Sequence, residues 1–136
     1  MAGNLPEKHV VTCFLECDGR VLILRRSQQV GSFRGRWAGI SGYVETTAGE
    51  QALVEIEEET GLCRDDVELV REGRQFKVTG GRARWVVHPF LFRIRNRDGI
   101  KIDWEHSDKR WILPGEIDDY PTVPKLKEVL KSVLGE

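Results

Sequence analysis

The sequence is short of net charge, long apolar runs and cysteine, and each shortage argues against a class of protein. Lys and Arg number 21 against 22 Asp and Glu, which leaves a formal net charge of −1. Without an excess of positive charge, neither a nucleic-acid polymer nor a membrane surface is expected as a main partner. No segment approaches the roughly 20 consecutive apolar residues that span a bilayer. The first residues, Met1–Lys8, lack the apolar centre of a signal peptide.

Cysteine is scarce, and the three residues are Cys13, Cys17 and Cys63. An odd number of cysteines without a second ligand pair favours free thiols over a disulfide framework or a zinc site. Reduced thiols are typical of the cytosol, so we expect a cytoplasmic protein. No repeat, low-complexity tract or linker interrupts the chain, and we expect residues 1–136 to form a single domain.

The apolar pattern predicts several strands and two well-separated helices. Runs of β-forming residues predict the strands, which are residues 9–16, 21–26, 67–70, 74–78, 84–94 and 111–112. Asp18-Gly19 is a tight-hairpin signal, and Pro89 predicts a sheet edge or a bulge. Pro124 suits the first position of a closing helix, whose apolar residues recur at helical spacing up to Leu134. Together these elements predict an α/β fold with a mixed β-sheet sandwiched between helices.

The first of the two helices is marked at both ends. Thr47 followed three residues later by Glu50 has the pattern of a capping box, so the helix should begin near Ala48. Gly61 is typical of the left-handed residue that ends a helix. The sequence therefore predicts one helix between these two signals.

Three acids of this helix are badly placed for folding. Glu55, Glu58 and Glu59 lie three and four residues apart, where like charges cost roughly 0.2–0.5 kcal/mol per pair. The negative end of the helix dipole disfavours each of them by about a further 0.3–1 kcal/mol. No Lys or Arg lies between Arg36 and Arg64 to neutralise them. One interpretation is a solvated acidic face, and the other is a site that binds a cation.

The segment before the helix favours the cation. Trp37–Glu45 is an aromatic residue followed by a glycine-punctuated turn, and it runs into the helix cap without a spacer. A helix that only faces solvent does not need glycines where its entry loop approaches. We therefore expect this turn and the acids to form one site.

Together, the two segments resemble the signature of the Nudix hydrolase family. That signature is Gly, five residues, Glu, seven residues, and then Arg-Glu-apolar-any-Glu-Glu-any-Gly-apolar. Residues Glu55–Leu62 match the second half after the Arg, and Gly42 matches the opening glycine. The first half departs, because Gly42 to Leu62 spans 21 residues where the family has 23. Val54 and Thr46 then stand where the family has the Arg and the first Glu, two residues that we expect to pair in the family.

The resemblance implies an α/β/α sandwich and a divalent metal site. It points to Glu55, Glu58 and Glu59 as ligands of Mg²⁺, with Mn²⁺ as a substitute metal and the Ser41 carbonyl as a further ligand. Carboxylates suit Mg²⁺, which prefers oxygen ligands and retains several waters. Glu58 is also a candidate for the base that activates water. A fourth acid often comes from a later loop in this family, and Glu105 is the candidate, with an exposed loop acid as the alternative.

The substrate-binding residues are less clearly marked. Arg25 and Arg26 end a predicted central strand, so one of them should point toward the cleft and hold phosphate. Trp37 is a candidate stacking platform for a base, although a core position is the alternative. Arg84 lies on a strand that could line the same pocket. His106 either orients a leaving group or forms a hydrogen bond within its loop.

The function that these residues predict is a Mg²⁺-dependent pyrophosphohydrolase. Its substrate would be a nucleoside triphosphate, or a nucleoside diphosphate linked to another group, and metal-assisted water would attack the diphosphate linkage. One alternative is a non-catalytic Nudix-like module that binds a nucleotide as a regulatory ligand. Another is an isomerase of a prenyl diphosphate. A homodimer is a further expectation, because members of this family are often dimeric.

Overall fold

The computed structural model describes residues 5–80 and 82–135. Within these ranges no helix is long and apolar enough to cross a membrane. The strands are β1 (Glu7–Cys17), β2 (Arg20–Arg26), β3 (Trp37–Ala38), β4 (Ile40–Tyr43), β5 (Val67–Glu72), β6 (Phe76–Gly80), β7 (Ala83–Ile94) and β8 (His106–Ile112). The helices are α1 (Ala48–Thr60) and α2 (Leu126–Val133), and two 3₁₀ turns, η1 (Arg64–Asp66) and η2 (Pro114–Asp119), lie outside them.

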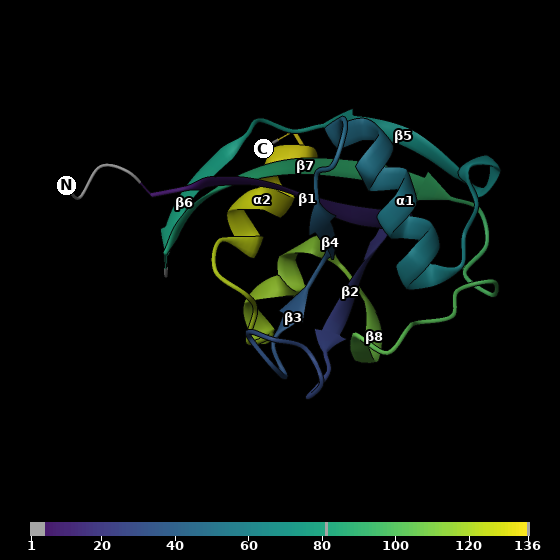
Figure 1. Ribbon diagram of the computed structural model, residues 1–136. Helices are drawn as coiled ribbons and strands as arrows, with labels where there is room; N and C mark the ends of the chain where they lie inside the picture. Colours follow the sequence, from purple (N-terminus) through teal and green to yellow (C-terminus); the bar gives the residue numbers. More distant parts are fainter. Residues whose placement is uncertain (1–4, 81, 136) are drawn as a thin grey trace.

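The eight strands form one mixed sheet built around β1 and β7, which pair in parallel (Figure 1). Two strands share the other edge of β1: β4 pairs antiparallel with Val10–Cys13, and β2 pairs antiparallel with Glu16 and Cys17. The sheet continues through β3 and β8 on β2, and through β5 and β6 on β7. This arrangement places the start of β4 and the end of β2 at one side of the sheet, where the candidate site lies.

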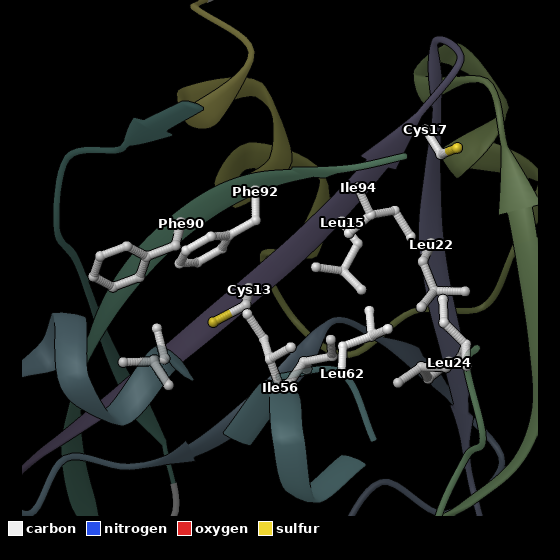
Figure 2. Close-up of a cluster of buried hydrophobic side chains, with 14 residues drawn as sticks. Cys13, Leu15, Cys17, Leu22, Leu24, Ile56, Leu62, Phe90, Phe92 and Ile94 are labelled. Atoms are coloured by element: carbon white, nitrogen blue, oxygen red, sulfur yellow. The ribbon is translucent and has the colours of Figure 1, made fainter. Parts of the chain in front are cut away.

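Alternation along the central strands builds a core on each face of the sheet. Side chains of β1, β2, β4 and β7 on one face pack with α1 (Figure 2). Those on the opposite face pack with α2 and η2. In β2, for example, Leu22 and Leu24 belong to the first core, whereas Val21 and Ile23 belong to the second. The predicted fold, a mixed β-sheet sandwiched between helices, is therefore confirmed.

The hairpin prediction at Asp18-Gly19 is confirmed by the backbone. Asp18 has φ of 52° and Gly19 has φ of 81°, and together they join β1 to β2. Positive φ at both central residues is the requirement of the tight turn whose twist matches two antiparallel strands. Of the cysteines, Cys13 and Cys17 are buried in β1, and Cys63 is exposed; all three are free thiols.

Two predictions from proline need correction. Pro89 lies within β7, a central strand, at the point where the antiparallel partner changes from β6 to β5. The N–H that proline lacks is not needed there, because neither β5 nor β6 continues its hydrogen-bonded ladder past Pro89. Pro124 precedes the closing helix instead of starting it: Lys125, with φ of 68°, is the cap residue, and α2 begins at Leu126. The predicted strand at 111–112 is also longer and already begins at His106.

The limits of α1 follow the capping signals. The Thr47 hydroxyl accepts the N–H of Glu50 at 3.3 Å, and Gly61, with φ of 80°, donates its N–H to the carbonyl of Glu57. The Glu50 side chain does not complete the capping box. It instead forms an exposed ion pair of 2.8 Å with Arg64, which follows the helix.

Val54 offers a simple check of the orientation of α1. Its side chain is 45% exposed, so Val54→Arg should fold normally and change the free energy of unfolding by less than about 0.7 kcal/mol, the range of ordinary helix propensities. Thermal denaturation in metal-free buffer measures this change. Loss of soluble protein would mean that residue 54 faces the core.

Candidate active site

One stripe of α1 turns polar side chains toward the sheet. Gln51, Glu55 and Glu59 recur every four residues, and all three are buried. Glu55 is 9% exposed and Glu59 only 1%. Glu58 and Glu57 are exposed on the neighbouring side of the helix. The three acids expected to act together thus divide into a buried pair and one residue that faces solvent.

The close approach of β4 to Glu55 requires a glycine. A Cβ built on Gly42 would collide with Cγ, Cδ and Oε2 of Glu55. Gly42 lies opposite Val11 of β1, so its position is fixed by the sheet ladder. The opening glycine of the signature therefore makes room for an acid of the helix.

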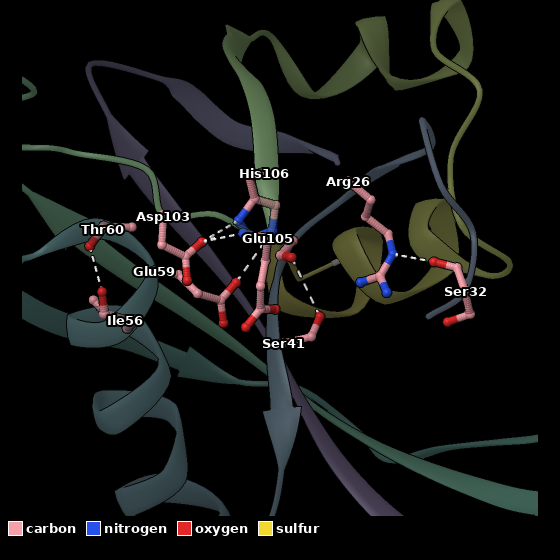
Figure 3. A network of polar contacts seen from close by, with 10 residues as sticks. Arg26, Ser32, Ser41, Ile56, Glu59, Thr60, Asp103, Glu105 and His106 are labelled. Carbon is pink, nitrogen blue, oxygen red and sulfur yellow. Dashed lines mark hydrogen bonds and ion pairs between the residues drawn. The ribbon is translucent and has the colours of Figure 1, made fainter. Parts of the chain in front are cut away.

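Glu59 lies in the most enclosed part of the cluster (Figure 3). Its Oε1 is 3.5 Å from Nε2 of His106, whose Nδ1 lies 3.1 Å from Oδ1 of Asp103. Among the described residues, its Oε2 is buried without a hydrogen-bond donor. Glu55, a second buried carboxyl group, lies close enough that its charge further raises the pKa of Glu59. Ionising both groups is therefore costly unless a positive charge lies beside them.

The electrostatics of the cluster agree with this geometry. Burial, followed by the charge of Glu105, raises the pKa of Glu59 to about 10. Burial also raises the pKa of Glu55, although the hydrogen bond from Gln51 works against it. The pKa of Glu105 is raised by burial and then by the charge of Asp103. Ionising these desolvated carboxyl groups together is therefore unfavourable, because their charges repel one another.

The residues present fit a hard divalent cation. They offer carboxylate oxygens, which are the ligands that Mg²⁺ prefers, and the unpartnered Oε2 of Glu59 lacks the positive partner that a cation would supply. In the described part of the chain, no three His, Cys, Asp or Glu side chains already form a complete metal-binding group. Glu55 and Glu59 would therefore provide the protein share of the ligands, while Glu58 faces outward.

Glu105 is brought to the buried pair by the start of β8. The carbonyl of Glu105 accepts the N–H of Ser27, which ties this segment to the end of β2. Its charge raises the pKa of Glu59, and the charge of Glu55 in turn contributes to the raised pKa of Glu105. His106, which follows it, is the first residue of β8 and is buried. Burial lowers the pKa of His106 despite its contact with Asp103.

Arg25 and Arg26 end β2 at an irregular point of the sheet, because the pairing with β8 shifts register between them. Arg26 lies on the side of the acids, where its charge lowers the pKa of Glu105 (Figure 3). Both side chains also hold the loop after β2: Arg26 Nε donates to the carbonyl of Ser32 at 2.9 Å, and Arg25 Nε to that of Gly35 at 3.2 Å. Their shared contact with this loop was not visible in the sequence.

The two other candidate substrate residues lie elsewhere. Trp37 is 7% exposed, and its ring packs against Tyr120 at 5.3 Å between centroids. This burial favours the structural role. Arg84 is exposed at the start of β7, opposite Glu7, whereas Val11, which faces Gly42, lies further along the same ladder.

Sequence reasoning missed Asp103 and Gln51. Asp103 holds the buried His106, and Gln51 donates a hydrogen bond to Glu55. The four-residue spacing of Gln51 from Glu55 was the signal for the second contact. Nothing local marks the first, because Asp103 and His106 meet Glu59 only through the fold.

A cavity of about 900 Å³ lies away from these acids. It opens beyond the C-terminal end of α1, and its lining carries charges of both signs. The lining residues are Gly61, Leu62, Arg64, Asp65, Asp66, Val67, Glu68, Arg93, Arg95, Asn96 and Gly99. The candidate site is thus defined by its chemistry and not by the size of a cavity.

Comparisons with known proteins agree with this fold. The NUDIX domain family matches residues 6–133, and comparison with curated protein sequences gives no match. The MutT protein from Methanosarcina mazei Go1 has a TM-score of 0.80 at 20% identity, over 94% of this chain and 93% of that one. A C. elegans Ap4A hydrolase in a binary complex has a TM-score of 0.74 at 14% identity, over 94% of each chain. The NUDIX domain of Shewanella oneidensis NrtR, complexed with ADP ribose, has a TM-score of 0.69 at 15% identity, over 95% of this chain and 86% of that one.

The fold and the acid cluster on α1 define an enzyme of the hydrolase class. The chain belongs to the Nudix hydrolase family, which acts on phosphoanhydride bonds, because the family match spans nearly all of its length. The solved structures, at these identities, add the likeness of fold.

Proposed function

We propose that this protein is a Mg²⁺-dependent pyrophosphohydrolase that also accepts Mn²⁺. Its substrate is a nucleoside triphosphate, or a nucleoside diphosphate linked to another group, and it cleaves the diphosphate linkage. One observation carries the proposal: Glu59 is buried against Glu55 with an oxygen that has no donor. A carboxylate in that position is costly for folding unless a cation pairs with it.

The proposed role of each residue follows from its position in the site. Glu55 and Glu59 hold the cation, which when bound neutralises phosphate charge and makes water a better nucleophile. Glu58 and Glu105 border the buried pair from two different elements. Either carboxylate is suited to accept the proton of the attacking water, and Glu58, on the neighbouring side of α1, is the proposed third ligand. Asp103 fixes the ring of His106 beside Glu59.

Substrate binding is assigned to the end of β2 and the loop that follows. Arg26 lies on the same side as the acids and retains guanidinium N–H groups beyond the one given to Ser32, so it is the leading phosphate ligand. Arg25, at the same strand end, is the second proposed substrate ligand, whereas the buried Trp37 and the distant Arg84 are left out of the proposed substrate-binding set. The neighbours named for Ap4A and ADP ribose support a nucleotide derivative as the substrate. A homodimer and a cytoplasmic location remain part of the proposal.

A second candidate is a regulatory module that binds a nucleotide without cleaving it. The exposed Glu58 and the NUDIX domain of NrtR bound to ADP ribose favour it. A panel of nucleoside triphosphates, nucleotide sugars and dinucleoside polyphosphates, incubated with Mg²⁺ and scored for released phosphate species, separates the two. Cleavage with turnover supports the enzyme, whereas saturable binding without products supports the module.

Mg²⁺ should stabilise the folded protein. A ligand that binds only the native state adds about 2.7 kcal/mol to the free energy of unfolding at a concentration 100 times its Kd. We therefore expect millimolar Mg²⁺ to raise the melting temperature by several degrees, and Glu59→Gln to abolish most of this shift. An unchanged midpoint for the unaltered protein would show that the acids bind no cation.

A further inference from the structure

Gln51 is buried where a glutamine would ordinarily face solvent. It lies in the first turns of α1, one turn before Glu55, and is only 7% exposed. Burying a primary amide is costly unless both its donor and its acceptor find partners. The hydrogen-bond partners of the Gln51 amide should therefore explain its burial.

The two ends of the amide have different partners. Its Oε1 accepts the backbone N–H of Glu45 at 3.2 Å, and its Nε2 donates to Oε2 of Glu55 at 2.7 Å. The chemistry fixes this orientation, because the backbone N–H needs an acceptor and the carboxylate needs a donor. Gln51 thus connects the loop before α1 to an acid of the site.

Glu55 is confined from two sides. The space that a Cβ at Gly42 would fill is occupied by the carboxyl group of Glu55, and Gln51 donates a hydrogen bond to one oxygen of that carboxyl group. Glu59 also acts on the pKa of Glu55, so the proposed cation would lie against both carboxyl groups. Confinement of this kind removes side-chain freedom before a ligand arrives.

The two positions that depart from the signature cannot provide this connection. Val54 and Thr46 are both exposed, and neither carries a charge. The loop between Gly42 and α1 is two residues shorter than in the family pattern, and within it the N–H of Glu45 lies 3.2 Å from Oε1 of Gln51. The chain therefore ties loop to helix through a neutral side chain.

We propose that Gln51 is the positioning residue of the acid site: its amide links the loop before α1 to Glu55 and orients that carboxylate for the cation. The inference rests on the proposed function, because it concerns how tightly Glu55 and Glu59 bind a divalent ion. Residues that orient metal ligands typically change metal affinity by 10–100-fold when they are replaced.

Two variants of the full chain separate the effect of the hydrogen-bond donor from the effect of side-chain size. Gln51→Glu keeps an acceptor for Glu45 but, when ionised, has no N–H for Glu55. Gln51→Met keeps the length without charge and removes both contacts. Val54→Ala, on the exposed side of the same helix, is the matched control. Free Mn²⁺ measured by electron paramagnetic resonance gives the Kd, and turnover gives the Mg²⁺ concentration of half-activation.

We expect both variants to bind Mn²⁺ about 10–100-fold more weakly and to need correspondingly more Mg²⁺. The substrate KM and the kcat at saturating Mg²⁺ should change far less, and Val54→Ala should match the unaltered protein. Equal or tighter Mn²⁺ binding by either folded variant overturns the proposal. If Gln51→Met fails to fold, Gln51→Glu decides, because it keeps the contact with the loop.

The same titration distinguishes this proposal from the proposed function. If the unaltered protein binds Mn²⁺ and loses it on Glu59→Gln, the cation site stands, and the variants of Gln51 then test positioning alone. If the unaltered protein binds no Mn²⁺, both are overturned. Binding that Gln51→Met leaves unchanged overturns only the role of Gln51.

Discussion

Glu59→Gln should reduce kcat at least about 100-fold, the upper end of the loss seen when residues around a metal are replaced. Glu59 is the most enclosed acid of the site, and its Oε2 has no other donor. The amide keeps the size of the side chain but removes the charge that a cation would meet. Steady-state turnover in saturating Mg²⁺, with the substrate identified by the panel, measures the loss.

The same variant should be more stable than the unaltered protein in metal-free buffer near neutral pH. Burial raises the pKa of Glu59 from 4.5 to about 10, so the folded protein prefers this group protonated. The unfolded chain releases that proton near pH 4.5, and stability is therefore lost progressively as the pH rises from there toward 10. Glutamine resembles the protonated form, so Glu59→Gln should flatten this pH dependence, as urea denaturation at several pH values would show.

Glu57→Gln is the matched control for both measurements. It makes the same chemical change on the exposed side of α1 and should alter neither turnover nor the pH dependence appreciably. If Glu59→Gln keeps full turnover, or melts at a much lower temperature without metal, the buried acid is a structural group and the proposed cation site is wrong.

Gly42→Ala should also remove most activity, by a different route. The added Cβ would collide with Glu55, whose side chain is flexible enough to rotate away. We therefore expect the carboxylate to leave the site, with a loss of turnover of about 100-fold. Mg²⁺ should no longer raise the melting temperature. Because the collision involves a side chain and not the backbone, the free energy of unfolding should change much less than activity does.

Gly49→Ala provides the control for Gly42→Ala. Gly49 lies in the first turn of α1, and a Cβ there meets nothing within 4 Å. Alanine favours a helix over glycine by roughly 0.5–1 kcal/mol, so this variant should be slightly more stable and fully active. If Gly42→Ala keeps activity and the metal-dependent shift in melting temperature, Glu55 is not a ligand in its present position.

Part of the site could be predicted because its signals are local. The spacing of Glu55 and Glu59 puts them on one side of α1, and the cap at Thr47 and the stop at Gly61 fix where that helix begins and ends. Glu105 could be proposed only by resemblance, since it is far from the helix in sequence. In the structure, Glu105 lies close enough to Glu59 that its negative charge raises the pKa of Glu59.

Other parts depended on which elements become neighbours. Glu58 is near Glu55 in sequence yet faces outward, because the packing of Ala52 and Ile56 against the sheet sets the rotation of α1. Trp37 could have stacked on a substrate or filled the core, and the contact with Tyr120 decides for the core. Composition contains no information about such choices.

The sequence alone determined the alternation of the strands, the limits of α1 and the concentration of acids on it, because these follow from spacing within a few residues. The tertiary structure decided which acids are buried and which groups surround them. Gln51, Gly42 and the pair Asp103–His106 act on Glu55 and Glu59 from several elements. Burial, followed by the charges of neighbouring carboxylates, raises the pKa of Glu59, and one of its buried oxygens has no partner among the described residues.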